Sequence, residues 1–187
     1  MGYVVMALRV ALAGVFLLSF LSKVRDRSAA RQFIDWVRQL ELVPPLLAPA
    51  VAGTMLLTEG TIVGLVAFEA TSALGFILAA ILMSLFSGGI GLILRRGGSI
   101  PCRCFGASTY PIGRTHLART LVVLAAAVLG AVATIALDPA SGHAAGNAIA
   151  VAVGIVIALL LRFIDEIVFL FTAPSVAPSA TRPRSSP

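Results

Sequence analysis

Two cysteines separated by a single residue form the stretch of this sequence best suited to chemistry. Cys102 and Cys104 flank Arg103, and further arginines lie nearby at positions 95, 96 and 114. The thiolate is the reactive form of cysteine, and neighbouring positive charge stabilises it. A disulfide across one intervening residue closes a small, strained ring that exchanges readily with other thiols. The pair is therefore suited to passing electrons by thiol/disulfide exchange.

Two other roles for the cysteines stay open. A free cysteine is often only a small buried hydrophobe, although this does not explain the proline, arginine and glycine around the pair. Two thiolates also suit a soft ion such as Cu(I), with His116 as a third ligand. A structural zinc is disfavoured because its usual spacing is C-x-x-C and the chain has no second pair. We favour the redox role and predict no metal site.

Charged residues inside apolar stretches are the second chemical signal. Glu59 lies near the middle of an apolar stretch, where a carboxylate needs a partner or a proton and marks a candidate functional site. Arg9 falls at a similar depth. At about 1.5 Å per residue, Glu59 lies about 13 Å and Arg9 about 9 Å from the outer face. The sequence therefore predicts an Arg9–Glu59 ion pair, which either fixes helix register or forms a proton-coupling or quinone site.

Two more basic residues lie at the ends of apolar stretches. Lys23 ends the first stretch and is interpreted as an interfacial charge that extends toward the headgroups. Arg119 follows the cysteines closely in sequence, so it either stabilises a thiolate or also extends to the membrane surface.

The composition identifies the environment in which these residues work. The chain has 187 residues, of which 59% are hydrophobic and 12% charged, and its mean hydropathy is +1.02. A soluble domain needs charged residues at about a quarter of its positions, so this chain must face lipid. Its net charge of +6 lies in short clusters between apolar runs, which indicates membrane topology and argues against nucleic-acid binding.

Five segments are apolar for about the 20 residues that a helix needs to cross the hydrocarbon. They are residues 3–21, 46–68, 72–94, 117–137 and 148–171. A polar break at 69–72 separates the second segment from the third. The first begins almost at Met1 without a basic leader, so we expect it to stay as a membrane helix. The sequence predicts an all-α polytopic transmembrane helix bundle.

Residues 28–42 form a different pattern between the first two spans. Apolar residues, including Trp36, recur at helical spacing with arginines elsewhere, which predicts an amphipathic helix. It lies either on the membrane surface, with Trp36 at headgroup level, or against the end of the bundle. At the other end of the chain, residues 173–187 are rich in proline, serine and alanine and are predicted to be disordered.

The loop charges predict which side each loop faces. The first and third loops between the spans carry Lys and Arg, whereas the second and fourth carry none. The positive-inside rule then puts the N-terminus outside and the C-terminus in the cytoplasm of a bacterial inner membrane. The loop with the cysteines would face the cytoplasm.

In this order, these features resemble the MauE/DoxX family of small bacterial membrane proteins, and its methylamine-utilisation MauE branch in particular. The resemblance covers about residues 7–137. It rests on residues 18–26, which read Leu-Ser-Phe-Leu-Ser-Lys-Val-Arg-Asp, on Glu59 followed by Gly64, and on residues 102–106 ahead of Arg119. It implies a DoxX-like four-helix core in residues 1–137, with an additional transmembrane helix in residues 138–172.

Members of this family are redox-associated membrane proteins. MauE supports the maturation of a periplasmic, disulfide-rich enzyme subunit through disulfide formation or isomerisation, and DoxX relatives are linked to quinone oxidation or thiol homeostasis. The resemblance implies that Cys102 and Cys104 are the redox pair, Glu59 is a buried acid, and Lys23 and Arg119 are supporting charges. Arg103 is a departure, because a small residue is expected between the cysteines. A cytoplasmic cysteine loop also conflicts with a direct role on exported substrates.

The sequence therefore favours a membrane-embedded thiol/disulfide redox protein that supports disulfide formation in, or electron transfer to, a partner protein. A thioredoxin-like or other thiol protein is the expected partner. The alternatives are a non-enzymatic accessory or scaffold subunit of a membrane oxidase or exported enzyme, and an electron carrier with bound quinone.

Overall fold

The chain folds into a bundle of long helices. The computed structural model describes residues 2–40, 43–96, 114–136 and 143–172. The elements in order are α1 (Gly2–Val24), α2 (Arg27–Gln39), α3 (Ala48–Ala67), a 3₁₀ turn η1 (Glu69–Thr71), α4 (Ser72–Arg95), α5 (Arg114–Ala136) and α6 (Ala144–Thr172). The described residues contain no strand, and the predicted all-α class is confirmed.

Five of these helices are long and apolar enough to cross a membrane. They are Gly2–Val24, Ala48–Ala67, Glu69–Arg95, Thr115–Ala136 and Ala145–Phe163. Each coincides with one of the five predicted spans, because the apolar runs set both the length and the place of each helix. The chain is therefore a multi-pass membrane protein. The predicted disordered tail, residues 173–187, lies outside the described residues.

The polar break between the second and third spans is a tight turn. Phe68 is extended, with φ −99° and ψ 137°, and ends α3. The Thr71 hydroxyl donates to the carbonyl of Leu65 over 2.7 Å, and the Ser72 hydroxyl donates to that of Glu69 over 2.8 Å. These bonds satisfy carbonyls that the helix end leaves unpaired. The turn makes α3 and α4 an antiparallel pair.

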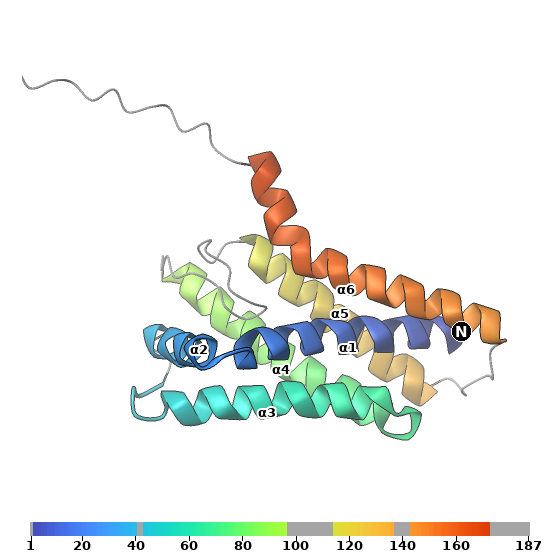
Figure 1. Ribbon diagram of the computed structural model, residues 1–187, viewed down its shortest axis with the longest axis horizontal. Coiled ribbons are helices and arrows are strands. Elements are labelled where there is room, and N and C mark those ends of the chain that lie inside the picture. The colour runs from blue at the N-terminus through green and yellow to red at the C-terminus, as the bar shows by residue number, and fades with distance from the viewer. Residues whose placement is uncertain (1, 41–42, 97–113, 137–142, 173–187) are drawn as a thin grey trace, which may run out of the picture.

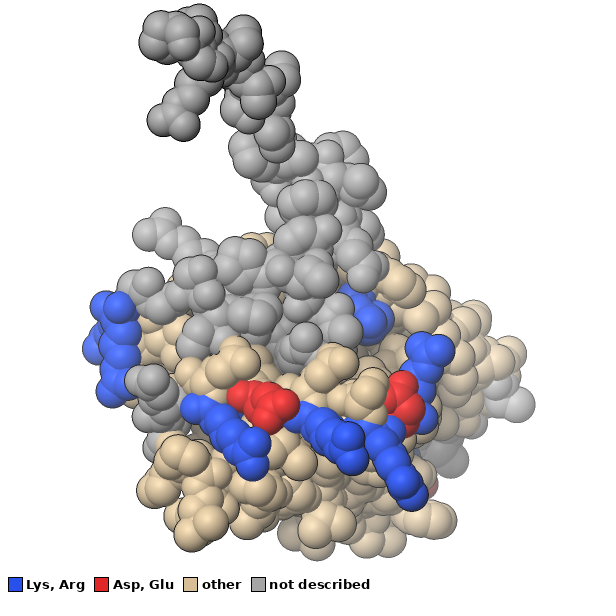
Figure 2. All heavy atoms as spheres, turned by 60° about the vertical axis from the view of Figure 1, so that its left-hand side comes forward, with Lys and Arg blue, Asp and Glu red and all other residues tan. Residues whose placement is uncertain are grey.

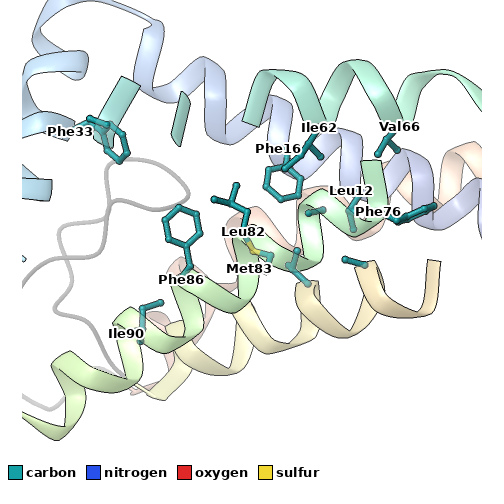
Figure 3. Close-up of a cluster of buried hydrophobic side chains, with 14 of the residues drawn as sticks. Leu12, Phe16, Phe33, Ile62, Val66, Phe76, Leu82, Met83, Phe86 and Ile90 are labelled. Carbon is teal, nitrogen blue, oxygen red and sulfur yellow. The ribbon is translucent and has the colours of Figure 1, made fainter. Parts of the chain in front are cut away.

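Helix α1 occupies the middle of the bundle (Figure 1). It packs mainly against α6 and α3, while α4 packs against α5 and α3. Figure 3 shows the apolar core, in which Phe16 of α1, Ile62 of α3 and Met83 of α4 come together. All three side chains are fully buried. Close packing of this kind holds helices together where lipid removes the hydrophobic driving force.

Glycines bring α6 directly onto α1. A methyl group added at Gly154 would lie 2.7 Å from the Ala7 carbonyl oxygen, and one added at Gly14 would lie 2.8 Å from the Ala158 Cβ. Small residues let helix backbones approach closely in this way. By contrast, an added methyl at Gly64 on α3 would meet nothing within 4 Å. The α1–α6 contact therefore depends on glycine.

The amphipathic segment is helix α2, which lies across one end of the bundle (Figure 1). The Asp26 side chain caps it by accepting the N–H of Ala29 over 2.8 Å, and this bond is the main cause that lowers the pKa of the Asp26 carboxyl. Phe33, Trp36 and Val37 are buried against α1 and α3. Of the two predicted arrangements, the structure has the helix packed on the bundle end. Only 3% of the Trp36 side chain is exposed there.

Candidate functional site

A buried ion pair lies between α1 and α3. The Lys23 ammonium is 2.6 Å from Oε1 of Glu59 and 2.6 Å from the Ser19 hydroxyl oxygen, and the Ser19 hydroxyl donates to Oε1 over 3.2 Å. The Lys23 and Glu59 side chains are 3% and 1% exposed. We call Ser19, Lys23 and Glu59 the buried charge cluster. Burying two charges in an apolar bundle is costly, so such a pair in a membrane helix marks a candidate functional site.

Helix geometry explains how the cluster assembles. Ser19 and Lys23 are four residues apart, so they lie on one face of α1, one turn above the other. This face packs against α3, which runs antiparallel to α1 and presents Glu59 to it. Lys23 is in the last turn of α1, where a cation is also favoured by the helix dipole.

An aromatic side chain of α2 covers the cluster. The Lys23 ammonium lies 5.1 Å from the centroid of the Phe33 ring, within the range of a cation–π interaction. Phe33 is in turn stacked on Trp36, with ring centroids 5.8 Å apart and planes at 16°. Helix α2 thereby closes the end of the bundle over the buried charges.

One oxygen of the cluster still has capacity to accept a hydrogen bond. Oε2 of Glu59 is buried and has no hydrogen-bond partner within the described ranges. An ionised carboxylate accepts at both oxygens, and a buried acceptor left unpaired is costly. Oε2 is therefore the atom of the cluster at which a proton, or a donor from another group, would be stabilised.

The predicted Arg9–Glu59 ion pair was wrong. Arg9 donates from Nε to the Val66 carbonyl over 3.1 Å and from Nη2 to the Ala67 carbonyl over 2.9 Å. These are among the last carbonyls of α3, which lack helical partners and attract cations. They lie seven or eight residues beyond Glu59, about 10–12 Å along the helix axis. Arg9 and Glu59 consequently do not frame a quinone site together.

Lys23 was also placed wrongly at the membrane interface. Its side chain turns into the bundle, because Glu59 and Ser19 offer two acceptors within reach and Phe33 covers the ammonium. Sequence reasoning missed Ser19 and Phe33. The signals were present: a hydroxyl one helical turn before the lysine, and an aromatic residue on the apolar face of the next helix.

Arg119 is a residue of α5 and lies near a part of α1 that does not carry the buried charge cluster. Its side chain is 5% exposed, so it does not extend to the surface of the protein. It lines a cavity of about 10 Å³ together with Val15 and Leu18 of α1 and Ala158 and Arg162 of α6. The structure therefore brings Lys23 and Glu59 together, and leaves Arg119 and Arg9 at two other places in the bundle.

The cysteine pair lies outside the described residues, as does Arg103. The described helices on either side do show where this connection attaches. Helix α4 ends at Arg95 and α5 begins at Arg114, and both of these ends lie toward the end of the bundle that carries α2 (Figure 1). The connection therefore attaches at the end of the bundle where α2 covers the buried charge cluster. No group of three or more His, Cys, Asp or Glu side chains suited to a metal ion is found in the described ranges.

Five apolar helices with an ion pair buried among them define a polytopic membrane protein with a charged site inside the bundle. The family model for methylamine utilisation protein MauE matches residues 1–133, and the chain belongs to the MauE family. The match includes α1 to α4 and nearly all of α5, while α6 lies beyond it. No curated protein and no solved structure was found to match the chain.

Proposed function

We propose that this MauE-family protein is a membrane-embedded thiol/disulfide redox protein in which Cys102 and Cys104 cycle between two thiols and one disulfide. The observation that carries the proposal is the position of the connection. Its two cysteines are one residue apart, and it joins α4 to α5 at the bundle end that carries α2. Arg95 and Arg96 precede it and Arg114 follows it, so positive charge from both sides favours the thiolate.

The proposed reaction is an exchange between this chain and a partner protein. A thiolate of the pair attacks a partner disulfide and forms a mixed disulfide, releasing one partner thiolate. The second cysteine then attacks its neighbour, which completes the intramolecular disulfide and frees the second partner thiol. Two electrons pass to the partner and no proton is gained or lost overall. The reverse exchange oxidises the partner.

The buried charge cluster supports this role as a fixed point of the bundle. Lys23 and Glu59 tie α1 to α3 by a 2.6 Å contact, and Phe33 ties α2 to the same lysine. We assign Lys23 and Glu59 as supporting residues that hold this end of the bundle in one arrangement. Arg119, in the second turn of α5, is assigned as a positive charge near the end of the cysteine connection.

The loop charges support the proposed orientation. The Lys and Arg residues of the connections at positions 23–38 and 95–114 favour the cytoplasmic side of a bacterial inner membrane. Electrons would then enter from a cytoplasmic thiol protein such as a thioredoxin.

Single serine variants of the purified chain in lipid nanodiscs test the reaction. We expect Cys102→Ser and Cys104→Ser, each with its remaining thiol activated as a mixed disulfide with thionitrobenzoate, to be trapped as a mixed disulfide with reduced thioredoxin that lacks its own resolving cysteine. The thioredoxin thiolate displaces thionitrobenzoate, and neither protein then has a second thiol to break the new bond. The double variant should form none, and Ser108→Ala, a change in the same connection that spares both sulfurs, should behave as the natural chain. If no variant is trapped and the double variant still supports partner oxidation in cells, the chain is an accessory subunit instead.

A further inference from the structure

A long apolar groove lies between α2, α3 and α4, separate from the buried charge cluster. Its volume is about 400 Å³. One wall comes from α3 and the other from α4 between Leu78 and Ile93. Trp36 of α2 and Leu40, which follows α2 directly, close one end. Neither Lys23 nor Glu59 lines it.

The groove has the shape and position of a site for a hydrocarbon chain. Leu78 and Ile93 are fifteen residues apart, which corresponds to about 22 Å along α4, compared with a hydrocarbon core about 30 Å thick. Both walls belong to helices long and apolar enough to cross the membrane. Ile81 and Leu85, which line the groove, are 54% and 68% exposed. The groove is therefore open sideways to the bilayer.

The polar groups in the groove do not suit a polar ring. Thr54 and Thr58 line it, but their hydroxyls donate to the carbonyls of Ala50 and Thr54 over 2.9 and 2.8 Å. Their hydrogens are thus used within α3, and none of the described residues that line the groove is charged. A quinone ring needs donors for its carbonyl oxygens, whereas a hydrocarbon chain needs none. The lining favours a chain.

The end of the groove closed by α2 is positively charged. Arg31 and Arg38 of α2 are exposed, and so are Arg95 and Arg96, which follow the groove residue Ile93 closely. In α2 the acidic side chain is Asp35, and it is paired with Arg38 over 3.0 Å. Figure 2 shows Lys and Arg side chains gathered along this end of the molecule. Guanidinium groups bind phosphate strongly and in a fixed geometry.

We propose that the groove binds one acyl chain of an anionic phospholipid, whose phosphate is held by Arg95 and Arg96. The chain lies between α3 and α4, and the headgroup lies at the level of α2, where a basic amphipathic helix is attracted to anionic lipid. The described residues that line the groove belong to the segment between Trp36 and Ile93, so binding of the acyl chain can be tested apart from the cysteine chemistry.

The single tryptophan of the chain, Trp36, provides the readout because it lines the groove. The protein is placed in phosphatidylcholine nanodiscs that contain a small fraction of phosphatidylglycerol with brominated acyl chains, which quench tryptophan on near contact. We expect stronger quenching than from the same fraction of brominated phosphatidylcholine. Unbrominated phosphatidylglycerol should relieve the quenching, and unbrominated phosphatidylcholine should not.

Two kinds of variant separate the two parts of the site. Thr54→Phe fills the groove and should reduce the quenching to the phosphatidylcholine level. Thr61→Phe is the matched control, because Thr61 is an exposed residue of α3 with the same kind of hydroxyl bond, to Leu57, but lies outside the groove. Arg95→Gln and Arg96→Gln should each weaken the preference for phosphatidylglycerol roughly fivefold.

Each contrary result overturns a defined part of the proposal. Quenching that Thr54→Phe leaves unchanged would mean that the chain does not occupy this groove. Equal quenching by the two brominated lipids would rule out the anionic headgroup. Relief of quenching by a long-chain quinone at a lower mole fraction than phosphatidylglycerol would make the quinone the occupant.

Discussion

Removing one member of the Lys23–Glu59 pair should destabilise the bundle far more than removing both. The two side chains are 3% and 1% exposed and their charged atoms are 2.6 Å apart. Breaking a buried pair of this kind costs about 3–5 kcal/mol, because one charge is left in an apolar interior. For a chain of this size that corresponds to a fall in Tm of about 6–20 °C.

The structure also predicts which single variant is worse. In Lys23→Met, Glu59 keeps only the 3.2 Å bond from Ser19, and Oε2 already lacks a partner in the described part of the chain. In Glu59→Leu, the Lys23 ammonium keeps the Ser19 oxygen and the face of Phe33. We therefore expect Lys23→Met to be the more destabilising. The double variant should lie close to the natural chain, since apolar replacement of a buried pair is often neutral or stabilising.

Unfolding in detergent, followed by circular dichroism and by the fluorescence of Trp36, measures these effects as a double-mutant cycle. The matched control is Arg38→Met, because Arg38 pairs with Asp35 at 3.0 Å on the surface, with side chains 48% and 57% exposed. Loss of that pair should cost less than about 1 kcal/mol. Single variants of Lys23 and Glu59 that cost no more than this control would refute the assignment of the pair as a fixed point of the bundle.

Three further changes test other contacts. Phe33→Leu keeps the apolar cover but removes the ring under the Lys23 ammonium, and it should cost about 0.5–2 kcal/mol in the same unfolding assay. Gly154→Val should separate α6 from α1 at a cost of about 1–3 kcal/mol, which loss of cross-linking between the two helices would report. Its control is Gly64→Ala, which should be neutral or slightly stabilising because the space around Gly64 is open. Because the folded-state pKa of Asp26 is lowered, its capping contribution is present above its ordinary pKa and lost as the pH falls through the lowered value. The protection of the first-turn amides of α2 against hydrogen exchange, measured relative to their intrinsic exchange rates at each pH, should therefore fall at acid pH in the natural chain but not in Asp26→Asn.

The spans and the amphipathic helix were predictable from the sequence because each depends on a local pattern. An apolar run of about 20 residues fixes a spanning helix wherever it occurs, and the polar break at 69–72 marked the turn before α4. The helical spacing of Phe33, Trp36 and Val37 likewise identified α2 and the face that it buries. These predictions needed no knowledge of neighbouring helices.

The partner of Glu59 was not predictable in the same way. Helix α1 is apolar on most of its surface, so the sequence gives little sign of which face turns toward α3. Depth along the membrane favoured Arg9, but contact is decided by rotation about the helix axis and by side-chain reach. Lys23 has the length to reach inward, and the carbonyls at the end of α3 are closer to Arg9. Helix packing, rather than the order of residues, made this choice.

Labelling of Cys102 and Cys104 with a membrane-impermeant maleimide, applied to each side of sealed vesicles after equilibration over a range of redox potentials, tests the proposed activity most directly. We predict that both thiols react from the cytoplasmic side once reduced, and that both become protected together over one narrow range of potential as the disulfide forms. If the two cysteines are labelled equally at every potential, or remain unlabelled from both sides until the membrane is dissolved, they are not an exchanging pair.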